Sequence, residues 1–285
     1  MLLLKTRSDL QQWLTDTRRQ GLRIGLAPTM GNLHAGHLEL LSLLQPHCEV
    51  RVCSIFVNPT QFGPNEDFDR YPRTLQQDQD LLEQVGCEVL FAPDTHTLYP
   101  DTLNPATRVV VSGLEDRWCG ATRPGHFQGV ATVVAKLLHL IQPDVACFGE
   151  KDYQQLSIIR QMVRDLDFPV EILACPTRRE SSGLALSSRN QYLTADERPR
   201  ASMIFEMLKQ ISKLINDRVH DYRMLESTAT NVLDKSGFIT EYFAIVDATT
   251  LEPATPATTQ LRVLAAARLG NTRLIDNVGL CLDTP

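Results

Sequence analysis

The sequence predicts an α/β fold, in which a Rossmann-like parallel sheet with flanking helices precedes a smaller α+β C-terminal domain. Up to about residue 176, short β-type runs alternate with helical ones, which is the pattern of a parallel sheet with crossover helices. After residue 177 this alternation gives way to helices followed by strands. With 285 residues, the chain is long enough for two such domains.

The first domain is predicted over residues 1–176. Its predicted strands are residues 22–26, 50–57, 88–91, 145–148 and 170–174. Between them, residues 36–44, 75–85 and 130–141 carry apolar residues at helical spacing. The last of these has a broad apolar stripe, so we expect it to be half buried or more.

The second domain is predicted over residues 177–285, with a hinge near Pro176 and Thr177. Thr194 and Glu197 have the spacing of a capping box, which predicts a helix running toward Val219. A second helix is expected over residues 222–235, and strands over 242–246, 261–266 and 272–275.

Composition restricts the partners of the chain. A formal charge of -6 argues against a surface that neutralises nucleic-acid phosphates, so no nucleic-acid partner is expected. Seven scattered cysteines form no C-x-x-C pair and indicate free thiols in a reducing compartment. The apolar run of residues 1–4 is too short for a signal segment, and no later run is long enough to span a membrane. We therefore predict a cytoplasmic protein with no membrane partner.

Polar segments follow several predicted strands. They are residues 28–37 (P-T-M-G-N-L-H-A-G-H), 58–62 (N-P-T-Q-F), 149–155 (G-E-K-D-Y-Q-Q) and 176–180 (P-T-R-R-E). In open parallel sheets, ligands bind at the carboxyl ends of the strands. We therefore expect these segments to converge on one cleft.

The first of these segments predicts a phosphate site. His34 and His37 stand three residues apart in the first turn of a predicted helix, where backbone N–H groups and the helix dipole favour anions. Gly31 and Gly36 allow a nucleotide to approach the backbone. An isolated H-x-x-H more often decorates a surface, but the strand-turn-helix setting favours phosphate binding. The chain has neither a G-x-x-x-x-G-K-[ST] loop nor a G-x-G-x-x-G turn.

Further cationic and hydroxyl groups lie at Lys151 and at residues 187–189 (S-S-R). Lys151 or Arg189 alone would more often be a solvated charge on the protein surface. Together with the histidines they form the donor set that adenylyl transfer needs, because negative charge develops on the leaving pyrophosphate.

Six segments of the sequence resemble those of the pantothenate synthetase family. Besides residues 28–37, the segments F-V-N-P-T-Q-F, D-x-x-R-Y-P-R-T, G-H-F-Q-G-V-A-T-V-V-A-K-L, F-G-E-K-D-Y-Q-Q and L-S-S-R-N occur in the family's order up to residue 190. The resemblance implies a ligase of pantothenate and coenzyme A biosynthesis. Such an enzyme condenses pantoate with beta-alanine, using ATP and releasing AMP and pyrophosphate, through a pantoyl-adenylate intermediate. The first domain would then bind ATP and pantoate, and the second would be its lid.

The resemblance also implies roles for individual residues. It implies catalytic roles for His34, His37, Lys151, Ser187, Ser188 and Arg189. ATP contacts are implied for these residues and for Pro28, Thr29, Met30, Gly31, Gly36, Gly149, Asp152, Arg178 and Leu186. Substrate contacts are implied for Phe56, Asn58, Gln61, Val133, Val134 and Gln155; amide groups suit the hydroxyls and carboxylate of pantoate, and a plain core role fits the two valines equally well. Arg123, also counted among the substrate-binding residues, is expected to reach the pyrophosphate or to cap the cleft. Asp78 is the implied ligand of Mg²⁺, although the residues alone fit a solvent-facing acid of the predicted helix equally well. The enzyme is implied to be a homodimer.

Two positions depart from the family pattern. Leu186 stands where Met is commoner, which preserves volume and apolarity. Arg178 stands where a small apolar residue is usual, so its side chain either points outward or alters nucleotide selectivity.

Two rival functions share the His-Gly-His turn. One is a cytidylyltransferase-like or aminoacyl-tRNA-synthetase-like enzyme, which would depend on CTP or tRNA. The other is a non-catalytic nucleotide sensor, which would bind ATP without releasing pyrophosphate. The full set of donors aimed at a leaving group favours the ligase.

Overall fold

The computed structural model describes residues 1–64, 66–101 and 107–282. The chain divides into two compact units. Unit 1 comprises Met1–Asp116, Arg123–Glu150 and Gln155–Pro176, and unit 2 comprises Arg117–Thr122, Lys151–Gln154 and Thr177–Pro285. Residues 283–285, which end the predicted second domain, lie outside the described residues.

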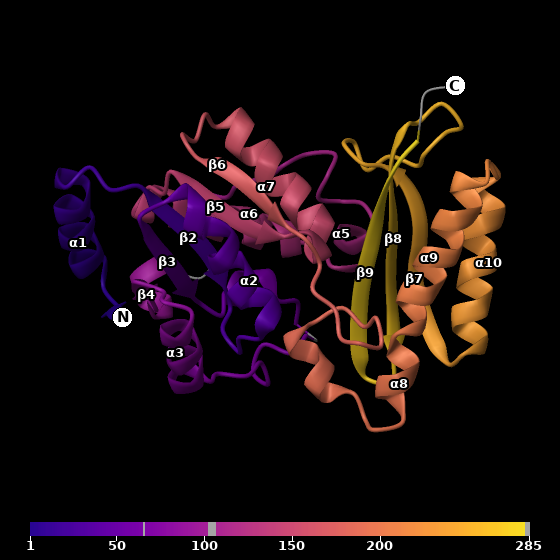
Figure 1. The fold of residues 1–285 in the computed structure, drawn as a ribbon, viewed down its shortest axis with the longest axis horizontal. Coiled ribbons are helices and arrows are strands. Elements are labelled where there is room, and N and C mark those ends of the chain that lie inside the picture. The colour runs from indigo at the N-terminus through magenta and orange to yellow at the C-terminus, as the bar shows by residue number, and fades with distance from the viewer. Residues whose placement is uncertain (65, 102–106, 283–285) are drawn as a thin grey trace. The chain divides into compact units, whose positions relative to one another are not determined.

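Unit 1 contains a six-stranded sheet in the order β1-β4-β3-β2-β5-β6, with every neighbouring pair parallel (Figure 1). The strands are β1 (Leu2–Leu4), β2 (Ile24–Thr29), β3 (Val50–Ile55), β4 (Val89–Phe91), β5 (Val145–Gly149) and β6 (Glu171–Cys175). The predicted parallel sheet is confirmed. The strand order reverses between β2 and β5, and ligands of such sheets bind at this kind of switch point.

The differences from the prediction include one additional strand and the end of another. β1 was not predicted, because three consecutive leucines show neither strand nor helix periodicity. It forms a strand by pairing with β4. β2 extends to Thr29, so Pro28 and Thr29 belong to the strand, where they pair with Ser54 and Ile55 of β3.

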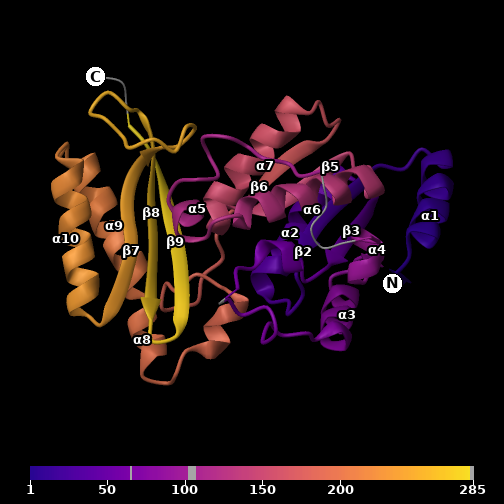
Figure 2. The ribbon, with the colours of Figure 1, turned by 180° about the vertical axis from the view of Figure 1, so that it is seen from behind.

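Helices cover both faces of this sheet, as right-handed crossovers require (Figures 1 and 2). The helices of unit 1 are α1 (Arg7–Arg19), α2 (Ala35–Leu44), α3 (Leu75–Gln84), α4 (Thr95–Leu98), α6 (His126–Ile141) and α7 (Tyr153–Asp165), of which α7 begins in a segment of unit 2. Short 3-10 turns occupy η1 (Gln45–His47) and η2 (Pro59–Gln61). Helices α1 and α7 were not predicted, although α1 buries Leu10, Leu14 and Thr17 at helical spacing.

The core of unit 1 on the α2 and α3 side is built from leucines and small residues. Leu40, Leu41 and Leu44 of α2 and Leu82 of α3 pack over buried side chains of the strands. Four cysteines belong to this cluster, and all seven cysteines of the chain are free thiols, as predicted. On α6, apolar side chains are buried along most of its length, which confirms the expected burial.

Unit 2 contains a three-stranded antiparallel sheet in the order β7-β8-β9. Its elements are α5 (Cys119–Thr122), η3 (Glu150–Asp152), η4 (Ser188–Tyr192), α8 (Glu197–Ala201), α9 (Met203–Asn216), α10 (Tyr222–Lys235), β7 (Phe238–Asp247), β8 (Gln260–Leu269) and β9 (Thr272–Cys281). The smaller α+β arrangement is confirmed, although the strands are longer than predicted because each continues beyond its apolar centre.

The predicted capping box forms. Thr194 N donates to Glu197 Oε2 at 2.9 Å, and Glu197 N donates to Thr194 Oγ1 at 3.2 Å. The single helix predicted after it is wrong, because α8 ends at Ala201 and α9 begins at Met203. At the break, the Ser202 hydroxyl donates to the Pro199 carbonyl at 3.0 Å and so competes with a helical bond.

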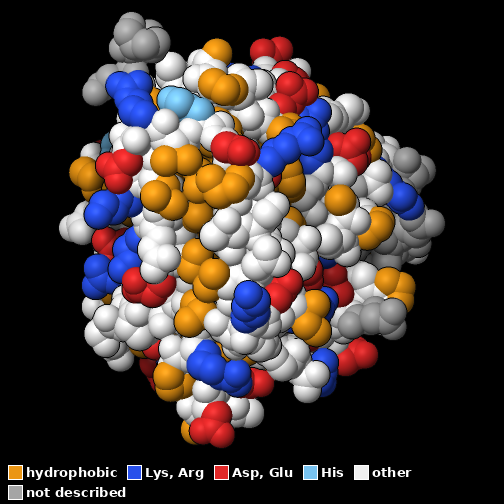
Figure 3. Space-filling view, turned by 90° about the vertical axis from the view of Figure 1, so that its right-hand side faces the viewer, with side chains coloured by type: hydrophobic (Ala, Val, Ile, Leu, Met, Phe, Trp, Pro, Cys, Tyr) orange, Lys and Arg blue, Asp and Glu red, His pale blue; other side chains and the backbone are white. Residues whose placement is uncertain are grey.

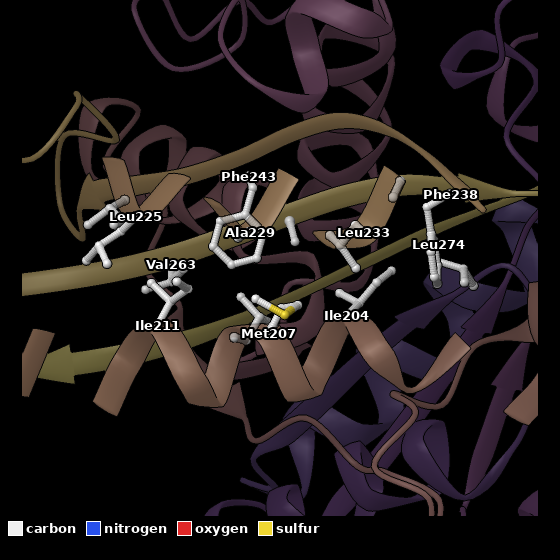
Figure 4. Close-up of a cluster of buried hydrophobic side chains, with 14 of the residues drawn as sticks. Ile204, Met207, Ile211, Leu225, Ala229, Leu233, Phe238, Phe243, Val263 and Leu274 are labelled. Atoms are coloured by element: carbon white, nitrogen blue, oxygen red, sulfur yellow. The ribbon is translucent and has the colours of Figure 1, made fainter. Parts of the chain in front are cut away.

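One face of the unit 2 sheet packs against α9 and α10 (Figure 4). Ile204, Met207 and Ile211 of α9 meet Leu225, Ala229 and Leu233 of α10 and strand residues that include Phe243, Val263 and Leu274. Truncating one such side chain typically costs about 2–5 kcal/mol of the free energy of unfolding. Unit 2 therefore has a hydrophobic core of its own.

The surface mixes charges of both signs. Figure 3 shows Lys and Arg side chains interspersed with Asp and Glu on one face of the molecule. Among the described residues, none of the helices has the length and apolar character needed to cross a membrane.

Candidate active site

The turn from β2 into α2 carries both histidines. His34 is the N-cap of α2: its Nδ1 accepts from Gly36 N at 3.1 Å, and His37 Nδ1 accepts from His34 N at 3.3 Å. The two rings stack with centroids 4.0 Å apart. Because Nδ1 is the acceptor in both rings, a neutral imidazole carries its proton on Nε2. Each histidine can therefore present an N–H donor to an anion at the start of the helix.

Backbone geometry before the helix depends on Gly31. This residue has φ +80°, and a Cβ built on it would lie 3.0 Å from Ile55 Cγ2 and 3.1 Å from Asp78 Oδ2. Asn32 also has a positive φ, of 49°. Gly31 N donates to Thr29 Oγ1 at 3.2 Å, so the end of β2 caps the turn.

Asp78 of α3 accepts hydrogen bonds from the backbone of this turn. Its side chain is almost completely buried; Oδ2 accepts from Asn32 N at 3.0 Å and Oδ1 from Leu33 N at 2.8 Å. The Thr74 hydroxyl lies 3.3 Å from both oxygens. Charge-assisted bonds of this kind are among the stronger hydrogen bonds in proteins.

These contacts bear on the predicted metal ligand. Both oxygens of Asp78 already accept backbone N–H groups, and the described residues contain no group of three or more His, Cys, Asp or Glu side chains that could hold a metal ion. These bonds show that the Asp78 carboxylate positions the turn. Ligation of Mg²⁺ by Asp78 stays a prediction.

Asn58 and Gln61 form a buried amide pair after β3. Asn58 Nδ2 donates to Gln61 Oε1 at 3.1 Å and to Gly129 O at 3.2 Å. Asn58 Oδ1 accepts from the hydroxyls of Thr60 at 2.9 Å and Tyr99 at 3.1 Å. Burial raises the pKa of Tyr99, so its hydroxyl stays a donor at neutral pH. The observed bonds make Asn58 a support for Gln61.

The amide of Gln61 reaches the histidine turn. Its Nε2 lies 3.1 Å from Met30 Sδ. The structure thus brings together two of the polar segments predicted to converge, residues 28–37 and 58–62. Helix α6 packs closely on η2, which requires a glycine at position 129, because a Cβ on Gly129 would lie 2.3 Å from Thr60 O.

Arg123 has two observed partners. It makes a bidentate pair with Glu66, at 2.7 and 2.5 Å, and its Nη1 lies 2.9 Å from His126 Nε2. His126 Nδ1 lies 2.8 Å from Gln61 O. Since Arg123 donates to Nε2, Nδ1–H is the donor to the Gln61 carbonyl. A chain of bonds from Glu66 therefore supports the backbone of Gln61, and substrate contact by Arg123 stays a prediction.

A cavity of about 260 Å³ opens beside this network in unit 1. Its lining includes Gln61, Tyr99, Arg108, His126 and Gln128. Pockets for drug-sized ligands typically span about 300–1,000 Å³, so this cavity suits a smaller polar molecule.

The remaining unit 1 candidates are less distinctive. Phe56, Val133 and Val134 are buried, which fits a core role as well as a pocket wall. Gln155 is half-buried on α7. Its neighbour Gln154 is buried and is held within unit 2, where it accepts from Cys119 N and donates to Arg117 O.

Unit 2 carries the other predicted phosphate ligands. Residues 178–186 form a hairpin, in which Arg179 pairs with Ala185 and Leu186 N donates to Arg178 O at 2.9 Å. Ser187 then caps η4, accepting from Arg189 N at 3.3 Å. Asn190 Nδ2 donates back to Ala185 O at 3.0 Å and fixes the turn of Ser187, Ser188 and Arg189. The Arg178 side chain is exposed, which agrees with the outward-pointing alternative.

Lys151 lies in η3 at the end of β5, after Gly149. Its Nζ is 3.4 Å from Asp152 Oδ2, and its carbonyl accepts from Asn277 Nδ2 at 2.9 Å. Lys151 and the serines therefore belong to one unit.

Several supporting residues were missed in the sequence. They are Glu66, Tyr99, His126 and Asn277, which contact Arg123, Asn58, the Gln61 backbone and Lys151, and no local motif marks them. The segment G-H-F was noted only as part of the resemblance, although it contains His126.

Comparison with known proteins agrees with this geometry. Residues 2–279 match the family described as Pantoate-beta-alanine ligase. The pantothenate synthetase of Hahella chejuensis is 48% identical over 282 residues, covering 99% of this chain and 100% of that protein. That of Alkalilimnicola ehrlichii is 51% identical over 283 residues, covering 99% of both.

Two solved structures have the same architecture. Pantothenate synthetase from Thermus thermophilus has a TM-score of 0.89 at 43% identity, covering 98% of this chain and 99% of that one. The pantoate-beta-alanine ligase of Francisella tularensis, complexed with "Beta-gamma ATP" and beta-alanine, has a TM-score of 0.78 at 34% identity, covering 98% and 97%. The chain belongs to the pantoate-beta-alanine ligase family.

Proposed function

We propose that this ligase joins pantoate to beta-alanine in two steps. In the first, the carboxylate of pantoate attacks the α-phosphorus of ATP, which forms pantoyl adenylate and expels pyrophosphate. In the second, the neutral amine of beta-alanine attacks the acyl carbon, loses a proton and expels AMP. The single observation that carries the proposal is the pair of histidines at the start of α2, whose Nδ1 atoms are both occupied by backbone N–H groups.

That observation favours phosphate chemistry for a physical reason. Two Nε2–H donors beside a helix N-terminus stabilise negative charge, and they are fixed in advance by the cap and by the stacked rings. Little covalent catalysis by the protein is needed, because orientation lowers the first barrier and the mixed anhydride is already reactive.

The triphosphate is also bound, in this proposal, by Lys151, Ser187, Ser188 and Arg189 of unit 2. Arg178 and Leu186 border the adenine, and Gly149 and Asp152 complete the ATP contacts. Unit 2 acts as a lid that keeps water from the adenylate.

Pantoate is bound through its polar and apolar faces. Gln61 and Gln155 bond its hydroxyls and carboxylate, while Phe56, Val133 and Val134 lie against its methyl groups. The buried bonds from Asn58 support this proposal, because they fix the Gln61 amide beside Met30 before any substrate arrives.

Mg²⁺ is proposed to accompany ATP. Bound to the phosphates, it would neutralise part of their charge, and such sites need only one or two protein carboxylates. Asp78 is the carboxylate that contacts the turn, but its oxygens serve Asn32 and Leu33, so no step is assigned to it. We further propose a cytoplasmic homodimer, whose oligomeric state light scattering would test.

One assay tests the function. We expect exchange of labelled pyrophosphate into ATP that requires pantoate, followed by AMP release when beta-alanine is added. A nucleotide sensor would give no exchange, and a cytidylyltransferase would require CTP. A synthetase would require an amino acid in place of pantoate for exchange, and tRNA in place of beta-alanine for AMP release. Failure of pantoate to support exchange would refute the proposal.

A further inference from the structure

Two adjacent polar residues are buried in β9. Asp276 and Asn277 are each 5% exposed. Asp276 pairs with Ala265 of β8, which belongs to the apolar cluster under α9 and α10. A carboxylate in such surroundings needs a charged, hydrogen-bonded partner.

Arg179 is that partner. Its Nη1 lies 2.5 Å from Asp276 Oδ2, its Nη2 lies 2.9 Å from Oδ1, and Oδ1 also accepts from Asn277 N at 2.7 Å. The guanidinium lies 3.6 Å above the ring of Phe205 in α9. A planar fork paired with a carboxylate and stacked on a ring has one well-defined position.

Arg179 fixes the hairpin of residues 178–186. Its Nη1 also donates to Gly183 O at 3.1 Å, across the hairpin turn. Gly183 has φ +92°, and a Cβ there would lie 2.8 Å from Phe205 Cδ1, so the turn packs closely on α9. Ala185 pairs with Arg179, and its carbonyl accepts from Asn190. Only Leu186, the last residue of the hairpin, separates Ala185 from Ser187.

Asn277 holds the second cationic segment. Because successive strand residues point to opposite faces, its side chain lies on the face away from Asp276. There Nδ2 donates to Lys151 O at 2.9 Å, and Oδ1 accepts from Arg262 Nε at 2.7 Å. The Arg262 guanidinium lies 3.8 Å above the ring of Tyr153, two residues after Lys151.

We propose that Asp276 and Asn277 are positioning residues for the triphosphate ligands of unit 2. Asp276 acts through Arg179 on Ser187, Ser188 and Arg189, and Asn277 acts on Lys151. These two neighbouring residues of β9 thus fix the positions of both cationic segments relative to the same strand. The inference rests on the proposed function, and it adds two residues that themselves touch neither ATP nor pantoate.

The rival explanation is that the ion pair merely stabilises unit 2. Buried ion pairs can often be replaced by apolar side chains without loss of stability, whereas removing one partner is strongly destabilising. This difference separates the two roles. Asp276→Asn should raise the KM for ATP and lower kcat, by about 10- to 100-fold in kcat/KM, since small misplacements of binding groups have effects of this size.

The decisive variant is the double substitution Arg179→Met with Asp276→Leu. We expect its thermal midpoint to return close to that of the wild type, while its KM for ATP in pyrophosphate exchange stays raised. Recovery of both the midpoint and the ATP kinetics would overturn the proposal, because a purely stabilising role of the ion pair would then explain both results.

A second variant covers the case in which the double substitution does not fold. Asn277→Ala removes the donor to the Lys151 carbonyl and leaves the ion pair in place. We expect a raised KM for ATP, and weaker ATP binding by calorimetry, with an unchanged KM for beta-alanine. Unchanged ATP binding would overturn the role of Asn277.

Glu241→Gln is the matched control. Glu241 and Arg273 form another ion pair of unit 2, at 2.8 Å with both side chains 14% exposed. This variant should lower the thermal midpoint and leave the KM for ATP unchanged. Wild-type exchange distinguishes the two failures: if the wild type shows none, the proposed function fails, and if it is active while the β9 variants match it, only this inference fails.

Discussion

The imidazole rings of His34 and His37 stack at 4.0 Å, and each accepts a backbone N–H of the α2 start through Nδ1. The contacts of the two histidines therefore stabilise the start of α2 and also prepare the rings for phosphate binding. The same hydrogen bonds that cap the helix also fix the tautomer of each neutral ring, with the proton on Nε2.

Replacement of His37 tests the chemical half of this relationship. His37→Ala should lower kcat for adenylate formation by ~10² to 10³, by analogy with the loss of one oxyanion donor. His34→Asn should keep the cap, because asparagine is a good N-cap, yet lose the Nε2 donor. His139→Ala, at an exposed position of α6, is the control. Near-normal pyrophosphate exchange in His37→Ala would defeat the assignment.

Removal of the Asp78 carboxylate tests whether it positions the turn or binds the metal. Asp78→Ala leaves the N–H groups of Asn32 and Leu33 without acceptors, which should cost roughly 2–6 kcal/mol of the free energy of unfolding, at about 1–3 per group. Asp78→Asn should be milder. In the milder variant we expect the Mg²⁺ concentration for half-maximal rate to stay unchanged while the KM for ATP rises. A higher Mg²⁺ requirement would instead identify Asp78 as a ligand.

The sequence predicted the histidine turn because its signal is local. A strand, a glycine turn and a capped helix all lie within residues 24–44, and each has a residue pattern of its own. The hold of Asp78 on that turn could not be predicted in the same way, because its bonds to Asn32 and Leu33 span more than forty residues. The fold shows the same contrast: α2 and α3 were predicted nearly to the residue, whereas β1 forms only because β4 is there to pair with it.

The split between α8 and α9 has a similar origin. Apolar periodicity continues through Ser202, so the pattern alone predicts one helix. The bond from the Ser202 hydroxyl to Pro199 O competes with it. Likewise, Lys151 and Asn277 meet only in the folded unit, and no pattern relates two residues so far apart in the chain.

Tyr99 should affect pantoate through the amide pair. Tyr99→Phe removes a donor to Asn58 Oδ1, which should cost about 1 kcal/mol of the free energy of unfolding. Because Asn58 supports Gln61, the KM for pantoate should rise several-fold, at an unchanged KM for ATP. Tyr222→Phe is the control, since the buried Tyr222 hydroxyl has no hydrogen-bond partner among the residues that the structure describes. Equal kinetics in the two variants would disprove the link from Tyr99 to Gln61.

Thiol labelling should separate the cysteines. A hydrogen bond with Cys175 and burial raise the pKa of Cys147, and burial raises the pKa values of Cys48 and Cys87 to about 11. A thiol of pKa about 11 is ionised in about one molecule in a thousand at pH 8, and the thiolate is the reactive form. We therefore expect iodoacetamide to modify the exposed Cys281 first in the native protein. Mass spectrometry that finds Cys147 alkylated before unfolding would contradict this order.

Asp144 should make stability depend on pH. Burial alone would raise the pKa of Asp144, but the Ile24 N–H, at 2.7 Å, and the Arg18 guanidinium, at 2.8 Å, outweigh it and hold the pKa below its ordinary value. A carboxylate with a lowered folded pKa contributes stability above its unfolded pKa, near 4, and loses it as the pH falls through the folded value.

Asp144→Asn should therefore be less stable than the wild type at pH 7, and the difference should shrink as the pH falls below about 4. Urea unfolding across this range measures it, with Asp165→Asn, at an exposed end of α7, as the control. A difference that stays constant at all pH values would mean that the amide loses packing or hydrogen bonds rather than charge. The bond to Ile24, at the first residue of β2, would then anchor the strand through geometry alone.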